Sequence, residues 1–217
     1  MSEGVGSPTP LTRLVLVRHG EAQCNVDRVV GGPKGCTGLS KLGVRQAEAL
    51  RDRLAVTGEL ADATALYSSV LPRALETAEI IAPAVGDLDV VEDCDLCELH
   101  PGECDGLRWD EFEERYGSPD GDPHRPLSPG GESLAVFLER IDKVLQRLVA
   151  EHQGETVVVS CHGGVVFGSL IRLLQLPMAG RPVSFEPTNT GVTEWLRVDS
   201  RWRLVRYNDA AHLADLG

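Results

Sequence analysis

The chain has 217 residues, with 21 lysines and arginines against 33 aspartates and glutamates, so its formal net charge is −12. This length suits one sizeable hydrophobic core, and the acidic balance argues against nucleic acid and anionic membrane surfaces as partners. The stretch 1–12 lacks the apolar core of a signal peptide, and no segment approaches the roughly 20 apolar residues that span a bilayer, so we expect a cytoplasmic protein.

The predicted elements alternate between strands and helices. Short β-rich or apolar runs predict strands at 14–17, 63–67, 89–91, 156–160, 192–198 and 202–207. Apolar stripes at helical spacing predict helices at 73–81, 133–150 and 164–174, and a further helix that Ser40 caps. The last two strands are close enough in sequence to pair antiparallel near a sheet edge.

This order predicts an α/β fold, namely one three-layer α/β/α sandwich with a mostly parallel sheet and an antiparallel edge. The domain is expected to span 13–207, with flexible ends at 1–12 and 208–217. The stretch Gly117–Gly131 is rich in Ser, Pro, Asp and Gly and follows three aromatic residues, Trp109, Phe112 and Tyr116. It is either a lid over a binding site or a plain solvated loop.

Three strand-to-helix turns carry cationic side chains or histidines. Arg18, His19 and Gly20 follow the first strand, Arg73 follows the second, and His162 follows the strand at 156–160. Open α/β sheets usually bind ligands at the carboxyl ends of their strands. There an arginine supplies a fixed cationic fork, a histidine acts as nucleophile or base near neutral pH, and Gly20 lets a ligand approach the backbone closely.

The order and spacing of these turns resemble the histidine phosphatase superfamily, which has the phosphoglycerate mutase-like fold, over about 14–198. The resemblance implies that Arg18-His19-Gly20 is the family signature, Arg73 the second arginine and His162 the second histidine. It also implies that Asn25 contacts the substrate phosphate. A plain turn is the alternative role for this asparagine.

A phosphate monoester dianion repels nucleophiles, so a catalyst must neutralise its charge and hold the reacting atoms in line. We expect His19, as a neutral imidazole, to attack phosphorus and form a phosphohistidine. Arg18, Arg73 and a protonated His162 would bind the phosphoryl oxygens. Backbone N–H groups of Gly163 and Gly164 at a helix start suit the same anion. Such a cluster requires no metal and no other cofactor.

The leaving alkoxide needs a proton, and Glu98 is the candidate donor because its surroundings resemble the Leu-x-Glu segment of the family. Glu103 and Asp105 are expected to be turn residues and are the alternative acids. The same segment has a second interpretation, because Cys94, Cys97, His100 and Cys104 have spacings that suit zinc or an iron–sulfur cluster. We expect free thiols here and no metal.

Within the family, the departures from the mutase pattern favour a phosphatase. The loop reads Val30-Gly31-Gly32-Pro33, and the arginine and tyrosine of the mutase pattern are absent beside Glu98. The sequence therefore predicts a phosphomonoester hydrolase for a small phosphorylated metabolite. A cofactor-dependent phosphoglycerate mutase and a non-catalytic phosphate-binding or metal-binding module are the alternatives. The sequence does not determine which metabolite is the substrate or whether the protein forms a homo-oligomer.

Overall fold

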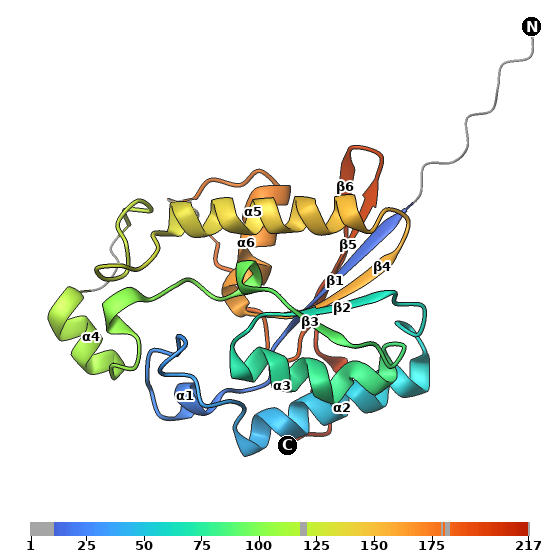
Figure 1. Ribbon diagram of the computed structural model, residues 1–217, viewed down its shortest axis with the longest axis horizontal. Helices are drawn as coiled ribbons and strands as arrows, with labels where there is room; N and C mark the ends of the chain where they lie inside the picture. The colour runs from blue at the N-terminus through green and yellow to red at the C-terminus, as the bar shows by residue number, and fades with distance from the viewer. Residues whose placement is uncertain (1–10, 118–120, 179, 181–182, 217) are drawn as a thin grey trace, which may run out of the picture.

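A mixed six-stranded sheet forms the middle layer of the protein (Figure 1). The computed structural model describes residues 11–117, 121–178, 180 and 183–216. Its strands are β1 (Thr12–Arg18), β2 (Ala65–Ser68), β3 (Val90–Glu92), β4 (Thr156–Cys161), β5 (Val192–Val198) and β6 (Arg201–Asp209). They lie in the order β3-β2-β4-β1-β5-β6; the first four are parallel, and β5 is antiparallel to both β1 and β6. This arrangement confirms the predicted fold class.

Helices cover both faces of the sheet. The helices α2 (Lys41–Thr57) and α3 (Pro72–Ile81) lie on one face, and α5 (Leu134–Glu151) and α6 (Gly163–Leu173) lie on the other (Figure 1). Alternating residues of β1 serve the two cores: Leu14 and Leu16 pack with α5 and α6, whereas Val15 and Val17 pack with α2 and α3. Burial on both faces explains why β1 and β4 read as continuous apolar runs.

The pairing of β1 with β4 positions the functional turns. The two strands run in parallel register up to Arg18 opposite Cys161, and the His19 N–H then donates to the Cys161 carbonyl at 2.9 Å. Because β2 lies on the other side of β4, the carboxyl ends of β1, β4 and β2 meet at one edge. The turns that follow these three strands are therefore neighbours in space.

Capping residues fix where the long helices begin. The Ser40 hydroxyl accepts a hydrogen bond from the Gly43 N–H at 3.0 Å, as predicted, and Ser133 caps α5 in the same way. Two further helices, α1 (Gln23–Val26) and α4 (Trp109–Tyr116), were not predicted. They are short, and a single residue of each is buried, so neither gives a clear apolar period.

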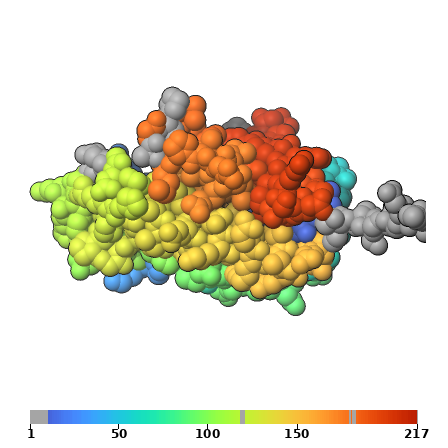
Figure 2. All heavy atoms as spheres, turned by 90° about the horizontal axis from the view of Figure 1, so that it is seen from above, coloured from blue at the N-terminus to red at the C-terminus, as the bar shows by residue number. Residues whose placement is uncertain are grey.

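The α4 region lies at one end of the molecule, and the β5–β6 hairpin lies at the other (Figure 2).

Among the described residues, no helix combines the length and the apolar character needed to cross a bilayer.

The segment after residue 207 is part of the fold, so the prediction of a flexible end at 208–217 is wrong for the described residues. Strand β6 continues to Asp209, and the short helix η4 (Ala211–Leu213) contacts α2. The Asp209 carboxylate accepts a hydrogen bond from Arg53 at 2.6 Å, which ties β6 to α2. At the other end, Thr12 already belongs to β1, and residues 1–10 lie outside the described part of the chain.

We expect Asp209→Asn to lower the free energy of unfolding by about 1–2 kcal/mol at pH 7, because it weakens a half-buried ion pair. The hydrogen bond from Arg53 holds the pKa of Asp209 below its usual value, so this contribution is complete above pH about 4 and declines as the pH falls below it. Urea denaturation at several pH values measures the effect, with Asp215→Asn, at an exposed position, as the control. An equal loss at pH 3 and pH 7 would contradict the assignment.

Candidate active site

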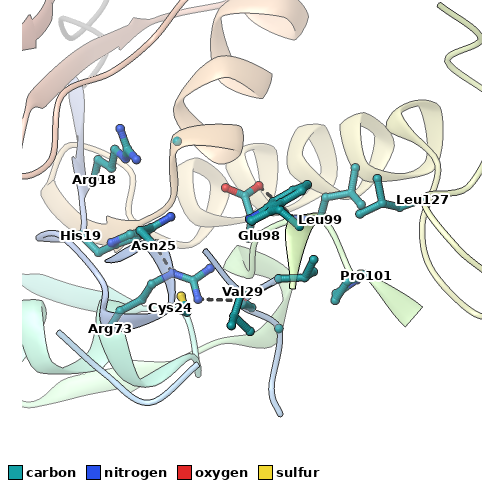
Figure 3. A pocket seen from close by; sticks show the side chains of 15 residues that line it. Arg18, His19, Cys24, Asn25, Val29, Arg73, Glu98, Leu99, Pro101 and Leu127 are labelled. Atoms are coloured by element: carbon teal, nitrogen blue, oxygen red, sulfur yellow. Dashed lines mark hydrogen bonds between the residues drawn. The ribbon is translucent and has the colours of Figure 1, made fainter. Parts of the chain in front are cut away.

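A cavity of about 320 Å³ opens at the edge where β1, β2 and β4 end. Figure 3 shows Arg18, His19 and Arg73 on one side of it and Glu98 and Leu127 on the other. The predicted residues Asn25 and Gly163 also line this cavity. The remaining predicted residue, His162, is fully buried behind it, with its ring centroid 5.1 Å from that of His19. The fold therefore brings together all seven residues that the sequence singled out.

The His19 imidazole is held as a neutral base. Its Nδ1 lies 2.6 Å from the Gly20 carbonyl oxygen, which can only accept, so Nδ1 carries the proton and Nε2 keeps its lone pair. The Arg73 Nε donates to that Nε2 at 3.0 Å. Burial lowers the pKa of His19 well below its ordinary value, and the Arg73 cation lowers it further. A neutral imidazole whose Nε2 keeps its lone pair is the form that can attack phosphorus.

Arg73 is buried and Arg18 is partly buried, and each donates to a backbone carbonyl. Arg73 donates from Nη1 to the Gly31 carbonyl at 2.7 Å, and Arg18 donates from Nη1 to the Pro187 carbonyl. Burial lowers the pKa of Arg18. The Nε atom of Arg18 has no hydrogen-bond partner among the described residues. A buried donor of this kind is suited to an anionic ligand.

The surroundings of His162 favour its neutral form. Its Nε2 lies 2.8 Å from the Ser69 hydroxyl, and its buried Nδ1 has no partner within the described ranges. Burial lowers the pKa of His162 well below its ordinary value, and the Arg73 cation lowers it further. The predicted positive contact therefore depends on a bound dianion, which favours the protonated ring.

Glu98 is fixed by backbone N–H groups. Its carboxylate accepts from Leu99 N at 3.0 Å and from Gly164 N at 3.0 Å. The predicted role of Gly164 as an anion donor is therefore wrong, because its N–H is used by Glu98. A Cβ atom on Gly164 would lie 2.0 Å from a Glu98 oxygen, so any larger residue here would displace the Glu98 carboxylate. A Cβ atom on Gly163 would meet Arg18 at an ordinary 3.5 Å.

Two further residues have roles other than those predicted. A Cβ atom on Gly20 would lie 2.4 Å from the Gly43 carbonyl oxygen, so this glycine allows close packing against α2 and not the approach of a ligand. The Asp105 carboxylate accepts from the N–H groups of Gly32, Lys34 and Gly35. It holds the glycine-rich loop and is therefore a turn residue, not an alternative acid.

Sequence reasoning missed the loop at 187–191, which binds the backbone carbonyls of the signature residues Arg18 and His19. Thr190 N–H donates to the Arg18 carbonyl at 2.8 Å, and Asn189 Nδ2 donates to the His19 carbonyl at 3.0 Å. Thr190 has a φ of 57°, which is unfavourable for a β-branched residue, and its hydroxyl lies 2.8 Å from His212 Nε2. The only signal in the sequence is a run of small polar residues before a strand.

The outer wall of the cavity is mostly apolar. Trp109 of α4 and Leu127 line it, and Leu127 packs with Phe112 and Tyr116 in a separate hydrophobic cluster. Leu127 belongs to the stretch Gly117–Gly131, of which residues 118–120 lie outside the described part of the chain. This stretch therefore borders the site, while its movement as a lid stays a prediction.

The cysteine-rich segment forms a cluster of three members. One ligand atom each from Cys94, Cys97 and His100 lies within 4.8 Å of the others. Cys104 is not among them, because its thiol donates to the Pro101 carbonyl at 3.1 Å. Of the four ligands that the spacing suggested, Cys104 is therefore not part of the cluster.

Comparison with known proteins identifies the family. Residues 14–210 match the model of the histidine phosphatase superfamily (branch 1), so the chain belongs to this superfamily. A relative from Arabidopsis thaliana named metal-independent phosphoserine phosphatase is 33% identical over 223 residues, which cover 100% of this chain and 89% of the relative. Another from the same organism, phosphoglycerate mutase-like protein 4, is 34% identical and covers 94% and 88%, respectively.

The fold is also found in a solved phosphatase structure. The structure of a mycobacterial glucosyl-3-phosphoglycerate phosphatase in complex with VO3 is similar with a TM-score of 0.76 and 30% sequence identity. The alignment covers 91% of this chain and 99% of that one. The family suggested by the three turns is thereby confirmed.

The buried histidines generate a pH prediction. Because burial and the Arg73 cation lower the pKa of His19 and His162, we expect both rings to be neutral at pH 6.5 and to titrate only at lower pH. Saturation with inorganic phosphate should raise the pKa of His162, since a neighbouring anion favours the imidazolium. Imidazole resonances in NMR spectra, assigned with His19→Ala and His162→Asn, measure both. A midpoint at the ordinary pKa of about 6.5 in the empty site would contradict this prediction.

Proposed function

We propose that the protein is a phosphomonoester hydrolase that acts on a small phosphorylated metabolite through a phosphohistidine intermediate. One observation carries the proposal: an unprotonated His19 Nε2 lies beside the buried Arg73 guanidinium, next to polar atoms of Arg18 and His162 that lack partners among the described residues. This combination suits a tetrahedral dianion that accepts several hydrogen bonds while one nitrogen attacks it.

The first step transfers the phosphoryl group to the protein. The substrate phosphate replaces His19 as the acceptor of the Arg73 Nε hydrogen bond, which frees the Nε2 lone pair. Nε2 then forms a bond to phosphorus as the ester P–O bond breaks, and a protonated Glu98 gives its proton to the departing alkoxide. Arg18 and Arg73 stabilise the charge on the equatorial oxygens.

The second step releases phosphate. Water attacks the phosphorus as the P–N bond breaks, and the Glu98 carboxylate takes the proton from the water. The products are an alcohol, inorganic phosphate and the original neutral His19. Both steps use the same cations, so no metal ion is needed for charge neutralisation.

The cavity lining supports hydrolysis over positional transfer. Among the residues that line it, Arg18 and Arg73 are the cations, and both are assigned to the phosphate. Residues such as Trp109, Leu127 and Pro101 make the remaining wall largely apolar. A phosphoglycerate mutase has to hold a carboxylate firmly while the phosphoryl group returns, which calls for a further cation. We therefore propose hydrolysis of a small phosphorylated metabolite and not positional transfer of its phosphoryl group.

We further propose that the protein acts in the cytoplasm and has neither nucleic acid nor a membrane surface as a partner. The net charge of −12 supports this, because an acidic surface repels both polyanions.

Replacement of the nucleophile tests the covalent step. We expect rapid acid-free quenching with labelled substrate to trap an acid-labile, base-stable phosphoryl group on the wild-type protein. His19→Ala should abolish both trapping and turnover, because it removes the nitrogen that we propose attacks phosphorus. His124→Ala, an exposed histidine outside the cavity lining, is the matched control and should leave both unchanged.

The proposed function would be wrong if His19→Ala kept full turnover on a panel of small phosphomonoesters. A wild-type protein that interconverts 2- and 3-phosphoglycerate faster than it releases phosphate would instead be a mutase.

Substitution of Glu98 tests the proton donor. We expect Glu98→Gln to slow hydrolysis of alkyl phosphates by about 10²–10⁴-fold, the usual value of general acid catalysis, because the amide cannot protonate the alkoxide. p-Nitrophenyl phosphate should be much less affected, since its leaving group needs little protonation. Steady-state kinetics with both esters make the comparison, and equal losses would move the acid role to another residue.

A further inference from the structure

The three-membered cluster of Cys94, Cys97 and His100 lies outside the catalytic machinery. Cys94 Sγ is 3.6 Å from Cys97 Sγ and 4.0 Å from His100 Nε2. These side chains line a cavity of about 30 Å³, which has room for an ion or a single water. The cavity adjoins the phosphate pocket and shares Glu98, Leu99 and Pro101 with it. Nothing in the proposed reaction uses the three side chains of the cluster.

We propose that this cluster binds a thiophilic divalent cation of the zinc type, as a site distinct from the phosphate pocket. Tetrahedral coordination with Zn–S of about 2.3 Å and Zn–N of about 2.0–2.1 Å places two sulfurs about 3.8 Å apart and sulfur and nitrogen about 3.6 Å apart. The observed separations of 3.6 and 4.0 Å are within a small side-chain adjustment of these values. Soft thiolates with an imidazole select zinc-like metals over calcium or magnesium.

A carboxylate lies near the second ring nitrogen of the histidine, as it does in many metal sites. Glu132 Oε2 lies 3.7 Å from His100 Nδ1, the ring nitrogen that does not meet the thiols. The same carboxylate accepts hydrogen bonds from the backbone N–H of His100 at 3.0 Å and from the Arg140 side chain at 2.6 Å. The separation of 3.7 Å from Nδ1 is too long for a hydrogen bond, but a small rotation of the ring would let Nδ1–H donate to the carboxylate, which would leave Nε2 available to a metal.

The Arg140 side chain holds the backbone of the segment that carries the ligands. Arg140 Nη1 donates to the carbonyls of Asp95 and Cys97, at 2.8 and 2.9 Å. Cys97 is buried, whereas Cys94 is exposed and gives an ion access from solvent. Because the described cluster supplies three protein ligands, the fourth position is left to water or another exchangeable ligand.

One hydrogen-bonded path connects the cluster to the active site. The Ser69 hydroxyl donates to Cys97 Sγ at 3.3 Å and lies 2.8 Å from His162 Nε2. Glu98 lies between the two ligands Cys97 and His100 in the chain. A bound cation therefore restrains the segment that carries the proposed acid without entering the phosphate pocket.

Metal titration of the reduced, EDTA-treated full-length protein tests the proposal. We expect one equivalent of Co²⁺ to bind with thiolate-to-cobalt charge-transfer bands and the visible spectrum of tetrahedral cobalt, and Zn²⁺ to displace it. Cys94→Ser and His100→Ala should each weaken binding by more than the roughly 10–100-fold that loss of an outer-shell partner costs. Zn²⁺ should raise the Tm of the wild-type protein and not of these variants.

Matched controls are a cysteine from the same segment and a histidine from another part of the chain. Cys104→Ala and His124→Ala should bind Co²⁺ like the wild-type protein, because neither side chain belongs to the cluster. Cobalt spectra without thiolate bands, unchanged affinity in Cys94→Ser, or no binding by the fully reduced protein would overturn the proposal. A disulfide between Cys94 and Cys97 in air, together with no binding after reduction, would mark the pair as a redox site instead.

The result is independent of the proposed function. His19→Ala should bind Co²⁺ with wild-type affinity, and the EDTA-treated protein should keep its hydrolytic turnover. Failure of metal binding therefore leaves the phosphatase proposal intact, and failure of hydrolysis leaves the metal site intact.

Discussion

Two guanidinium groups enclosed in one pocket are the constraint on which the rest of the site depends. The carboxylate in the same pocket, Glu98, accepts hydrogen bonds from backbone N–H groups, so the arginines are held by the carbonyls of Pro187 and Gly31. Burial together with this local positive field lowers the pKa of both histidines well below its ordinary value. The excess of positive charge persists in an acidic protein because exposed charges are screened beyond about 8–10 Å, whereas contacts within the pocket are not.

The layered fold could be predicted because burial leaves a direct record in the sequence. Strands β1 and β4 are covered on both faces and contain the continuous apolar runs 14–17 and 157–159, and α5 has a continuous apolar stripe. The same reasoning fails for α1 and α4, since each buries a single residue and has no period to read. It also fails after residue 207, where the chain is held by an ion pair with Arg53, and not by an apolar face.

The site was predictable where chemistry is local to a turn and unpredictable where it depends on distant contacts. His19 and Arg73 follow strands directly, so their neighbourhood follows from sheet order. Ser69 hydrogen-bonds to His162, and Thr190 hydrogen-bonds to the backbone of Arg18. Neither contact could be predicted from the spacing of these residues in the sequence. The cysteine segment shows the same limit, because spacing suggested four ligands while the turn at Pro101 directs one thiol away.

The contact between His212 and Thr190 has a consequence for how the protein matures. Thr190 has an unfavourable backbone conformation beside the carbonyl of Arg18, and the partner that braces it comes from the last helix of the described fold. During synthesis, the signature turn leaves the ribosome early and His212 leaves it late. A nascent chain that lacks His212 therefore lacks this contact, and the loop at 187–191 should hold the signature turn less firmly until residue 212 has been made.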